Sequence, residues 1–316
     1  MKRLFLTILV LLTTLFAVEP EYESYLSGRI LIYSTTEDAP YRPNISRIIR
    51  KAIEEITFDF DCFSEDTLVV YIAPSRRAFR EMTNGTLPSW VGAFAVPNSR
   101  AMIIKSPRWS QDLSFETTIV HELTHLILHD CLEGAEIPRW LDEGLAIFYS
   151  KEERRKTSTV LSKAIASNSL IPLDQIEWVL EYGRIKADLA YQESYSATLY
   201  FLQTYDIDGL RQLLGGLRRR LPLDECFILA TGSSFRQFEA EWRAYISTHE
   251  KYVWLYELED YFWVGVIFLA VAAFIAKWIR KRRIEREWEE ESVQSGTTET
   301  ADGDREGLVV NDDEIE

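Results

Sequence analysis

The chain has 316 residues and carries 50 acidic against 35 basic side chains, a formal net charge of −15 at neutral pH. Hydrophobic residues make up 47% of it and aromatic residues 13%, which is enough to fill a core and excludes a wholly disordered protein. The acidic balance argues against nucleic-acid binding, because that function needs a basic surface. Residues 284–316 hold thirteen acidic and two basic side chains, so the rest of the chain has a net charge of only −4.

The N-terminus joins two basic residues to an apolar run. Lys2 and Arg3 precede residues 4–18, which hold only apolar side chains and threonine. This pattern is typical of a secretory signal sequence, although Leu15 stands where a small residue is preferred before a cleavage site. We therefore expect residues 1–18 to be a signal sequence or an uncleaved anchor, and either one exports the segment after it.

A second apolar segment lies near the C-terminus. Residues 261–279 read YFWVGVIFLAVAAFIAKWI, which at about 1.5 Å per residue is long enough to cross the core of a bilayer. Trp263 and Trp278 lie toward its two ends, and the basic residues 280–283 predict that the chain continues into the cytoplasm. We expect a single-pass protein of the cell membrane, with residues 19–254 outside the cytoplasm.

The remaining residues, 280–316, begin basic and continue strongly acidic. They lack hydrophobic periodicity, so the sequence predicts a disordered cytoplasmic tail. Docking of a partner on the acidic part is an alternative to a purely solvated segment.

The segment between the two apolar stretches combines strand-like and helical patterns. Its strand-like runs are residues 27–36, 67–73, 90–96 and 101–104. Residues 44–58 carry isoleucine and alanine at helical spacing, and from Ser114, a potential helix cap, the pattern becomes mostly helical. A sheet-rich half followed by a helical half predicts an α+β domain rather than repeated βα units.

Three of the four histidines, His121, His125 and His129, fall within nine residues. They lie in residues 114–130, SFETTIVHELTHLILHD, which the apolar spacing predicts to be a helix. HExxH spans His121 to His125, and residues four apart on a helix are rotated by only about 40°, so both imidazoles can reach one metal ion. Glu122 projects beside them, where its carboxylate can take a proton from water. His129 is explained by the attraction between a cation and a helix C-terminus.

A candidate for a third metal ligand lies downstream of this motif. Residues 139–146, RWLDEGLA, predict a short helix with acidic residues near its start. Glu143 follows His125 by 18 positions, which leaves room for a loop and a reversal of direction. A neighbouring antiparallel helix could then present this carboxylate to the same ion, completing the three protein ligands of a catalytic zinc site. Asp142 is the alternative ligand.

HELTH followed by RWLDEGLA resembles the gluzincin zinc metallopeptidases, most closely their peptidase MA-like family. The resemblance implies His121, His125 and Glu143 as zinc ligands and Glu122 as the general base. It also implies a thermolysin-like zincin domain, with a mixed N-terminal sheet, the HExxH helix and a helical C-terminal half, here followed by a single transmembrane helix. A peptide or protein would be the substrate.

A later segment resembles the part of this family that supplies a catalytic tyrosine. Residues 190–195 read AYQESY, on a predicted helix that runs to Thr204. The match places the role on Tyr191, with Tyr195 as the second candidate. Ser194 stands where many gluzincins have glycine.

The family's aminopeptidases hold the amino terminus of the substrate with a glycine-methionine-glutamate-asparagine motif. The corresponding residues 90–95, WVGAFA, contain no acid, which disfavours an exopeptidase. A strand edge that offers only backbone hydrogen bonds suits an extended peptide crossing the site, so we expect an endopeptidase. The alternative function is a non-catalytic, zinc-containing, membrane-anchored binding or scaffold protein.

The three cysteines are Cys62, Cys131 and Cys226. They are too few for a disulfide scaffold and have no CxxC spacing. In an oxidising compartment a disulfide between Cys131 and Cys226 is one hypothesis.

Overall fold

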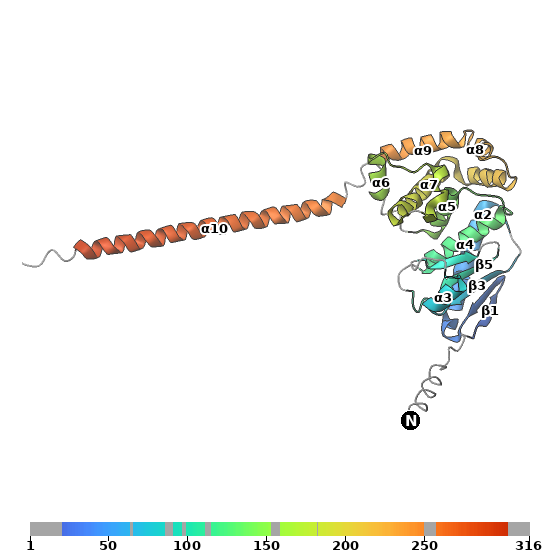
Figure 1. The fold of residues 1–316 in the computed structure, drawn as a ribbon, viewed down its shortest axis with the longest axis horizontal. Helices are drawn as coiled ribbons and strands as arrows, with labels where there is room; N and C mark the ends of the chain where they lie inside the picture. Colours follow the sequence, from blue (N-terminus) through green and yellow to red (C-terminus); the bar gives the residue numbers. More distant parts are fainter. Residues whose placement is uncertain are drawn as a thin grey trace, which may run out of the picture. The chain divides into compact units, whose positions relative to one another are not determined.

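The computed structural model describes residues 21–63, 66–85, 91–96, 99–110, 115–152, 159–181, 183–249 and 257–302. The chain divides into two units, Met1–Trp254 and Leu255–Glu316. The first holds a sheet and most of the helices, and the second holds one long helix (Figure 1). The predicted signal at residues 1–18, the helix cap at Ser114 and the last part of the tail, residues 303–316, lie outside the described residues.

The sheet of the first unit is mixed. Its strands, in the order β1-β2-β3-β5-β4, are β1 Glu23–Ser27, β2 Ile30–Ser34, β3 Leu68–Ala73, β5 Ala101–Lys105 and β4 Ala93–Val96. The inner strands β2, β3 and β5 are parallel, and the outer strands β1 and β4 are antiparallel to their neighbours. The predicted run 27–36 is interrupted by a tight turn at Gly28, where a φ of +62° favours glycine, so β1 precedes β2.

Helices on the two faces of the sheet bury alternate strand residues. The elements of this half are η1 Thr36–Tyr41, α2 Arg42–Phe60 and α3 Arg76–Met82. Ile32, Val70 and Ile104 are buried in the core that includes α2 and α4 Phe115–Cys131. Ile103, which points to the other face, belongs to a smaller cluster under α3. The period of two in the strands thus determines which helix each residue meets.

The second half of the unit is helical. After α4 come α5 Arg139–Ser150, α6 Thr159–Ala166, η3 Leu173–Glu181, α7 Arg184–Arg218, α8 Leu223–Thr231 and α9 Phe235–His249. Helix α7 is interrupted at Asp206, whose φ of 55° is not helical, two residues beyond the predicted end at Thr204. A sheet-containing half followed by a helical half confirms the predicted α+β class.

Helices α5 and α7 approach closely at Gly144. A Cβ atom there would lie 2.0 Å from Thr198 Oγ1 and 2.4 Å from the Ser194 carbonyl oxygen. Only glycine fits this contact, so the glycine after Glu143 fixes α5 against α7.

The disulfide joins Cys62, just after α2, to Cys131 at the end of α4, with the Cα atoms 5.7 Å apart. The hypothesis of a Cys131–Cys226 bond is therefore wrong. Cys226 is a free thiol, and burial raises its pKa. It packs against α7 at Gly216, where a Cβ would lie 2.9 Å from the Cys226 sulfur. Spacing along the chain does not reveal which helix ends meet in space.

The second unit contains α10, Glu257–Asp302. Its segment Phe262–Arg286, with a mean hydropathy of 2.2, is long and apolar enough to cross a membrane, by length and composition alone. The structure differs from the expectation of a tail disordered from residue 280, because α10 continues to Asp302. Residues 280–291 are rich in strong helix formers and include an i,i+4 pair, Lys281 Nζ to Glu285 Oε1 at 3.6 Å.

Candidate metal centre

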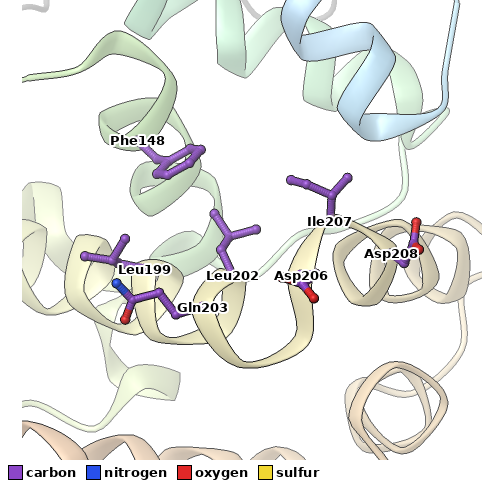
Figure 2. A pocket seen from close by; sticks show the side chains of 7 residues that line it. All are labelled: Phe148, Leu199, Leu202, Gln203, Asp206, Ile207 and Asp208. Atoms are coloured by element: carbon purple, nitrogen blue, oxygen red, sulfur yellow. The ribbon is translucent and has the colours of Figure 1, made fainter.

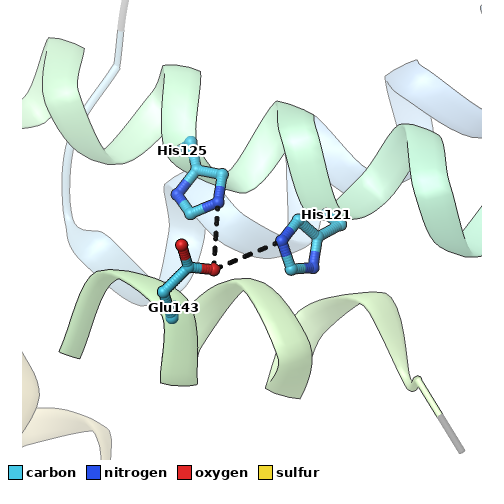
Figure 3. A group of neighbouring side chains, drawn as sticks. All are labelled: His121, His125 and Glu143. Carbon is cyan, nitrogen blue, oxygen red and sulfur yellow. Dashed lines mark ion pairs between the residues drawn. The ribbon is translucent and has the colours of Figure 1, made fainter. Parts of the chain in front are cut away.

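The two HExxH histidines lie on the side of α4 that faces α5. The two helices run antiparallel, as their contacts show: His129 is near Asp142, and His121 is near Glu152 beyond the end of α5. Pro138 precedes α5 and, lacking a backbone N–H, suits the start of a helix. Figure 3 shows the resulting arrangement, in which His121 and His125 point toward Glu143.

Three potential ligand atoms converge in this contact. The Glu143 Oε2 atom lies 3.5 Å from His121 Nε2 and 3.7 Å from His125 Nε2. All the ligand atoms lie within 4.8 Å of one another, and the Glu143 side chain is only 3% exposed. Two imidazole nitrogens and one carboxylate oxygen are a donor set that zinc accepts, so these residues fit a metal ion.

Asp142 contacts His125 on the side away from the cluster, and it also contacts His129. Its Oδ1 lies 2.6 Å from His125 Nδ1, and its Oδ2 lies 3.4 Å from His129 Nε2. With Nδ1 of His125 directed at Asp142, Nε2 faces the cluster, as is usual for metal-binding histidines. The carboxylate of Asp142, the alternative ligand in the sequence, thus supports His125 from behind. His129, explained from the sequence by the helix end, contacts the same carboxylate.

The carboxylates strongly perturb the titration of the metal-free site. Burial alone lowers the pKa of His125, but the charge and hydrogen bond of Asp142 outweigh it and raise this pKa to about 10. Burial raises the pKa of Glu143, yet His121, His125 and Arg139 together lower it to about 2. Without a metal, His125 is therefore protonated at neutral pH while Glu143 is ionised. A metal that binds both must displace the His125 proton.

Glu122 contacts the edge of the sheet. Its Oε2 accepts a hydrogen bond of 2.8 Å from the backbone N–H of Ala95 in β4. This contact fixes the carboxylate beside the histidines that flank it in the sequence. The Lys105 N–H donates a hydrogen bond to the Gly92 C=O, so Gly92 and every second residue after it direct their backbone N–H and C=O groups toward β5. Ala93 and Ala95, which lie between them, direct their backbone groups to the side away from β5.

Tyr191 and Tyr195 are half-buried on α7, one turn apart. Tyr191 lies near enough to Arg139 to contribute to the raised pKa of that guanidinium, which burial by itself lowers. Arg139 in turn forms an ion pair with Glu143. The structure thus links Tyr191 to the cluster through Arg139.

Besides the contacts of Asp142, sequence reasoning missed three contacts of the site. These are the ion pair of Arg139 with Glu143, the hydrogen bond from Ala95 to Glu122, and Glu152 Oε2, 3.8 Å from His121 Nδ1. The i,i+4 spacing of Arg139 and Glu143 on the predicted helix could have revealed the first. The other two join residues whose proximity depends on the fold.

A separate groove lies between α5 and the interrupted part of α7 (Figure 2). It has a volume of about 430 Å³, and its lining is mostly apolar. The lining residues are Phe148, Leu199, Leu202, Gln203, Asp206, Ile207 and Asp208.

Fold and site together define an α+β domain in which an HExxH helix and a neighbouring helix form a potential metal centre. The model of the peptidase MA superfamily matches residues 60–248, and the chain belongs to this superfamily. Membership points to a metallopeptidase, in agreement with the resemblance seen in HELTH and RWLDEGLA. A comparison with curated proteins finds no match.

Proposed function

We propose that the protein is a membrane-anchored, zinc-dependent endopeptidase of the gluzincin type, with a thermolysin-like catalytic domain outside the cytoplasmic membrane. The observation that carries the proposal is the convergence of His121, His125 and Glu143, with Glu122 fixed beside them on the outer side of β4, the last strand of the sheet among the described residues. A solely structural zinc site does not need this additional carboxylate, so the geometry favours an enzyme over a scaffold.

Each residue of the site has a separate role in the proposed reaction. His121, His125 and Glu143 would hold the zinc. Zinc supplies a Lewis acid that polarises a carbonyl and lowers the pKa of water. Glu122 takes the proton of the attacking water and delivers it to the leaving amine. Tyr191 donates a hydrogen bond to the oxyanion, a contribution of about 3 kcal/mol for a donor of this kind.

The edge strand β4 suits an extended substrate. Among the described residues β4 is the last strand of the sheet, and Ala93 and the Ala95 C=O present backbone groups on the side away from β5, so a peptide can add to the sheet there. The Ala95 N–H on this side is already bonded to Glu122. The first residues of this segment, Val91 and Gly92, and the strand itself carry no acid that could bind a free amino terminus. Cleavage within a chain therefore fits the site better than removal of a terminal residue.

Two apolar segments support the membrane assignment. Residues 1–18 would direct export, and the apolar part of α10 would stop transfer and anchor the enzyme. The basic residues 280–283 favour a cytoplasmic side for the rest of the chain beyond them.

The direct test is cleavage of a mixed peptide library by the zinc-loaded chain and by its Glu122→Gln variant. We expect the variant to keep the metal and to lose about 10²- to 10⁴-fold in turnover, the usual contribution of a general base. Equal turnover in both proteins would contradict the assigned mechanism. A zinc-loaded wild type that cleaves no peptide or protein substrate would favour the scaffold.

A further inference from the structure

The two carboxylate oxygens of Glu143 have different partners. Oε2 faces both imidazoles, 3.5 Å from His121 Nε2 and 3.7 Å from His125 Nε2. Oε1 forms an ion pair with the guanidinium of Arg139. Figure 3 shows one oxygen between the two rings and the other directed away from His121. One face of the carboxylate is thus directed to the cluster, while its second oxygen is occupied by a cation.

The position of Arg139 on α5 directs its guanidinium to Glu143. Arg139 is the first residue of α5 and lies four positions before Glu143, so both project from one face of the helix. Its backbone N–H donates a hydrogen bond of 3.0 Å to Glu177 Oε1, and its Nη1 lies 4.0 Å from Asp142 Oδ2. The partner carboxylate is buried, so the charged contact is little screened by water.

We propose that Arg139 is a positioning residue that restricts Glu143 to one metal-binding oxygen; this inference rests on the proposed function. A carboxylate can bind a metal through one oxygen or through both. Binding through both would use the position that a catalytic zinc keeps open for water or substrate. Because Arg139 engages Oε1 with a charge-assisted hydrogen bond, this oxygen stays off the metal, and the open position is preserved.

The alternative is that the ion pair only stabilises the fold. The two roles predict different behaviour of the metal. A purely structural partner leaves the coordination unchanged, and its loss weakens metal affinity, typically 10- to 100-fold for outer contacts. If Arg139 keeps Glu143 Oε1 off the metal, the coordination changes when Arg139 is removed. Metal affinity then does not fall, because the ion gains a donor atom and loses a nearby positive charge.

Cobalt(II) can report this difference in the full chain, because its visible absorption weakens as the number of donor atoms increases. The decisive variant is Arg139→Met, which removes the guanidinium that pairs with Oε1. Arg139→Lys restores a cationic donor. Arg77→Met is the matched control, because Arg77 and Glu81 form the same i,i+4 pair at 2.7 Å, but the Arg77 side chain is 79% exposed.

We expect Arg139→Met to bind cobalt no more weakly than wild type, with a loss of visible absorption per bound ion and a loss of peptide cleavage. Arg139→Lys should recover the wild-type spectrum, and Arg77→Met should retain it. An unchanged spectrum in Arg139→Met, or its failure to retain cobalt, would overturn the inference. If the wild-type chain bound no cobalt or zinc, the proposed function itself would fail, a result distinct from the other two.

Discussion

Helix α5 meets α4 with charged side chains and α7 with a close-packed, largely uncharged surface. Toward α4 it presents Asp142 and Glu143, both buried and both in contact with histidines. Toward α7 it presents Gly144, where the backbones of the two helices approach too closely for any side chain. Helix α5 can hold buried charges in place on one side because its other side is fixed by packing.

The largest expected effect comes from the packed side. Gly144→Ala would place a methyl group 2.0 Å from Thr198 Oγ1 and 2.4 Å from a backbone oxygen of α7, so the helices must separate. We expect the free energy of unfolding to fall by about 3 kcal/mol, at the upper end for overpacking, and the metal site to be disturbed with it. Chemical denaturation of the full chain measures this change.

Gly215→Ala is the matched control, because a Cβ at this helical glycine meets nothing within 4 Å. It should be neutral or stabilising by up to about 1 kcal/mol, as expected for glycine replaced by alanine in a helix. A Gly144→Ala protein as stable as Gly215→Ala would contradict the tight contact of α5 with α7 at this glycine.

An intermediate effect is expected on the charged side. Asp142→Asn keeps the shape of the side chain but removes the negative charge behind His125. We expect the limiting zinc affinity, with His125 deprotonated in both proteins, to fall about 10- to 100-fold, because contacts that orient a metal-binding histidine typically contribute this much. Competition with a chelator measures the loss. Asp174→Asn, an exposed acid in the first turn of η3, should leave the affinity unchanged.

Zinc binding should also depend on pH. Because the pKa of His125 is about 10 in the metal-free protein, zinc must displace a proton below that pH. Apparent zinc affinity should rise about tenfold per pH unit from neutrality toward pH 10 and then level off. In Asp142→Asn the rise should end at a lower pH, since the carboxylate that raises this pKa is gone.

The same shift has the opposite sign for the stability of the metal-free protein. A histidine whose pKa is raised from 6.5 to about 10 stabilises the fold below pH 6.5, and this contribution is lost as the pH rises through 10. Thermal unfolding of the metal-free chain should therefore move to lower temperature across this range. A flat profile would contradict the raised pKa.

Features that depend on spacing within one element were predictable from the amino-acid order alone. The interval between His121 and His125 predicted that both rings share a face of α4, because 3.6 residues per turn fixes the direction of each side chain. The acidic start of residues 139–146 predicted a carboxylate from α5. The strand-like composition of residues 67–73 predicted a strand, which is β3.

Contacts between residues of different elements depend on how the chain folds. The fold placed Asp142 behind His125, brought Ala95 to Glu122 and paired Cys131 with Cys62, and it directed Glu143 to the cluster, as the resemblance had implied. Adjacent acids on a helix differ by about 100° in direction, so the rotation and distance of the neighbouring helix select between them. The rotation and distance of the helices are fixed by packing over the whole core, including the contact at Gly144. No local sequence pattern specifies this packing.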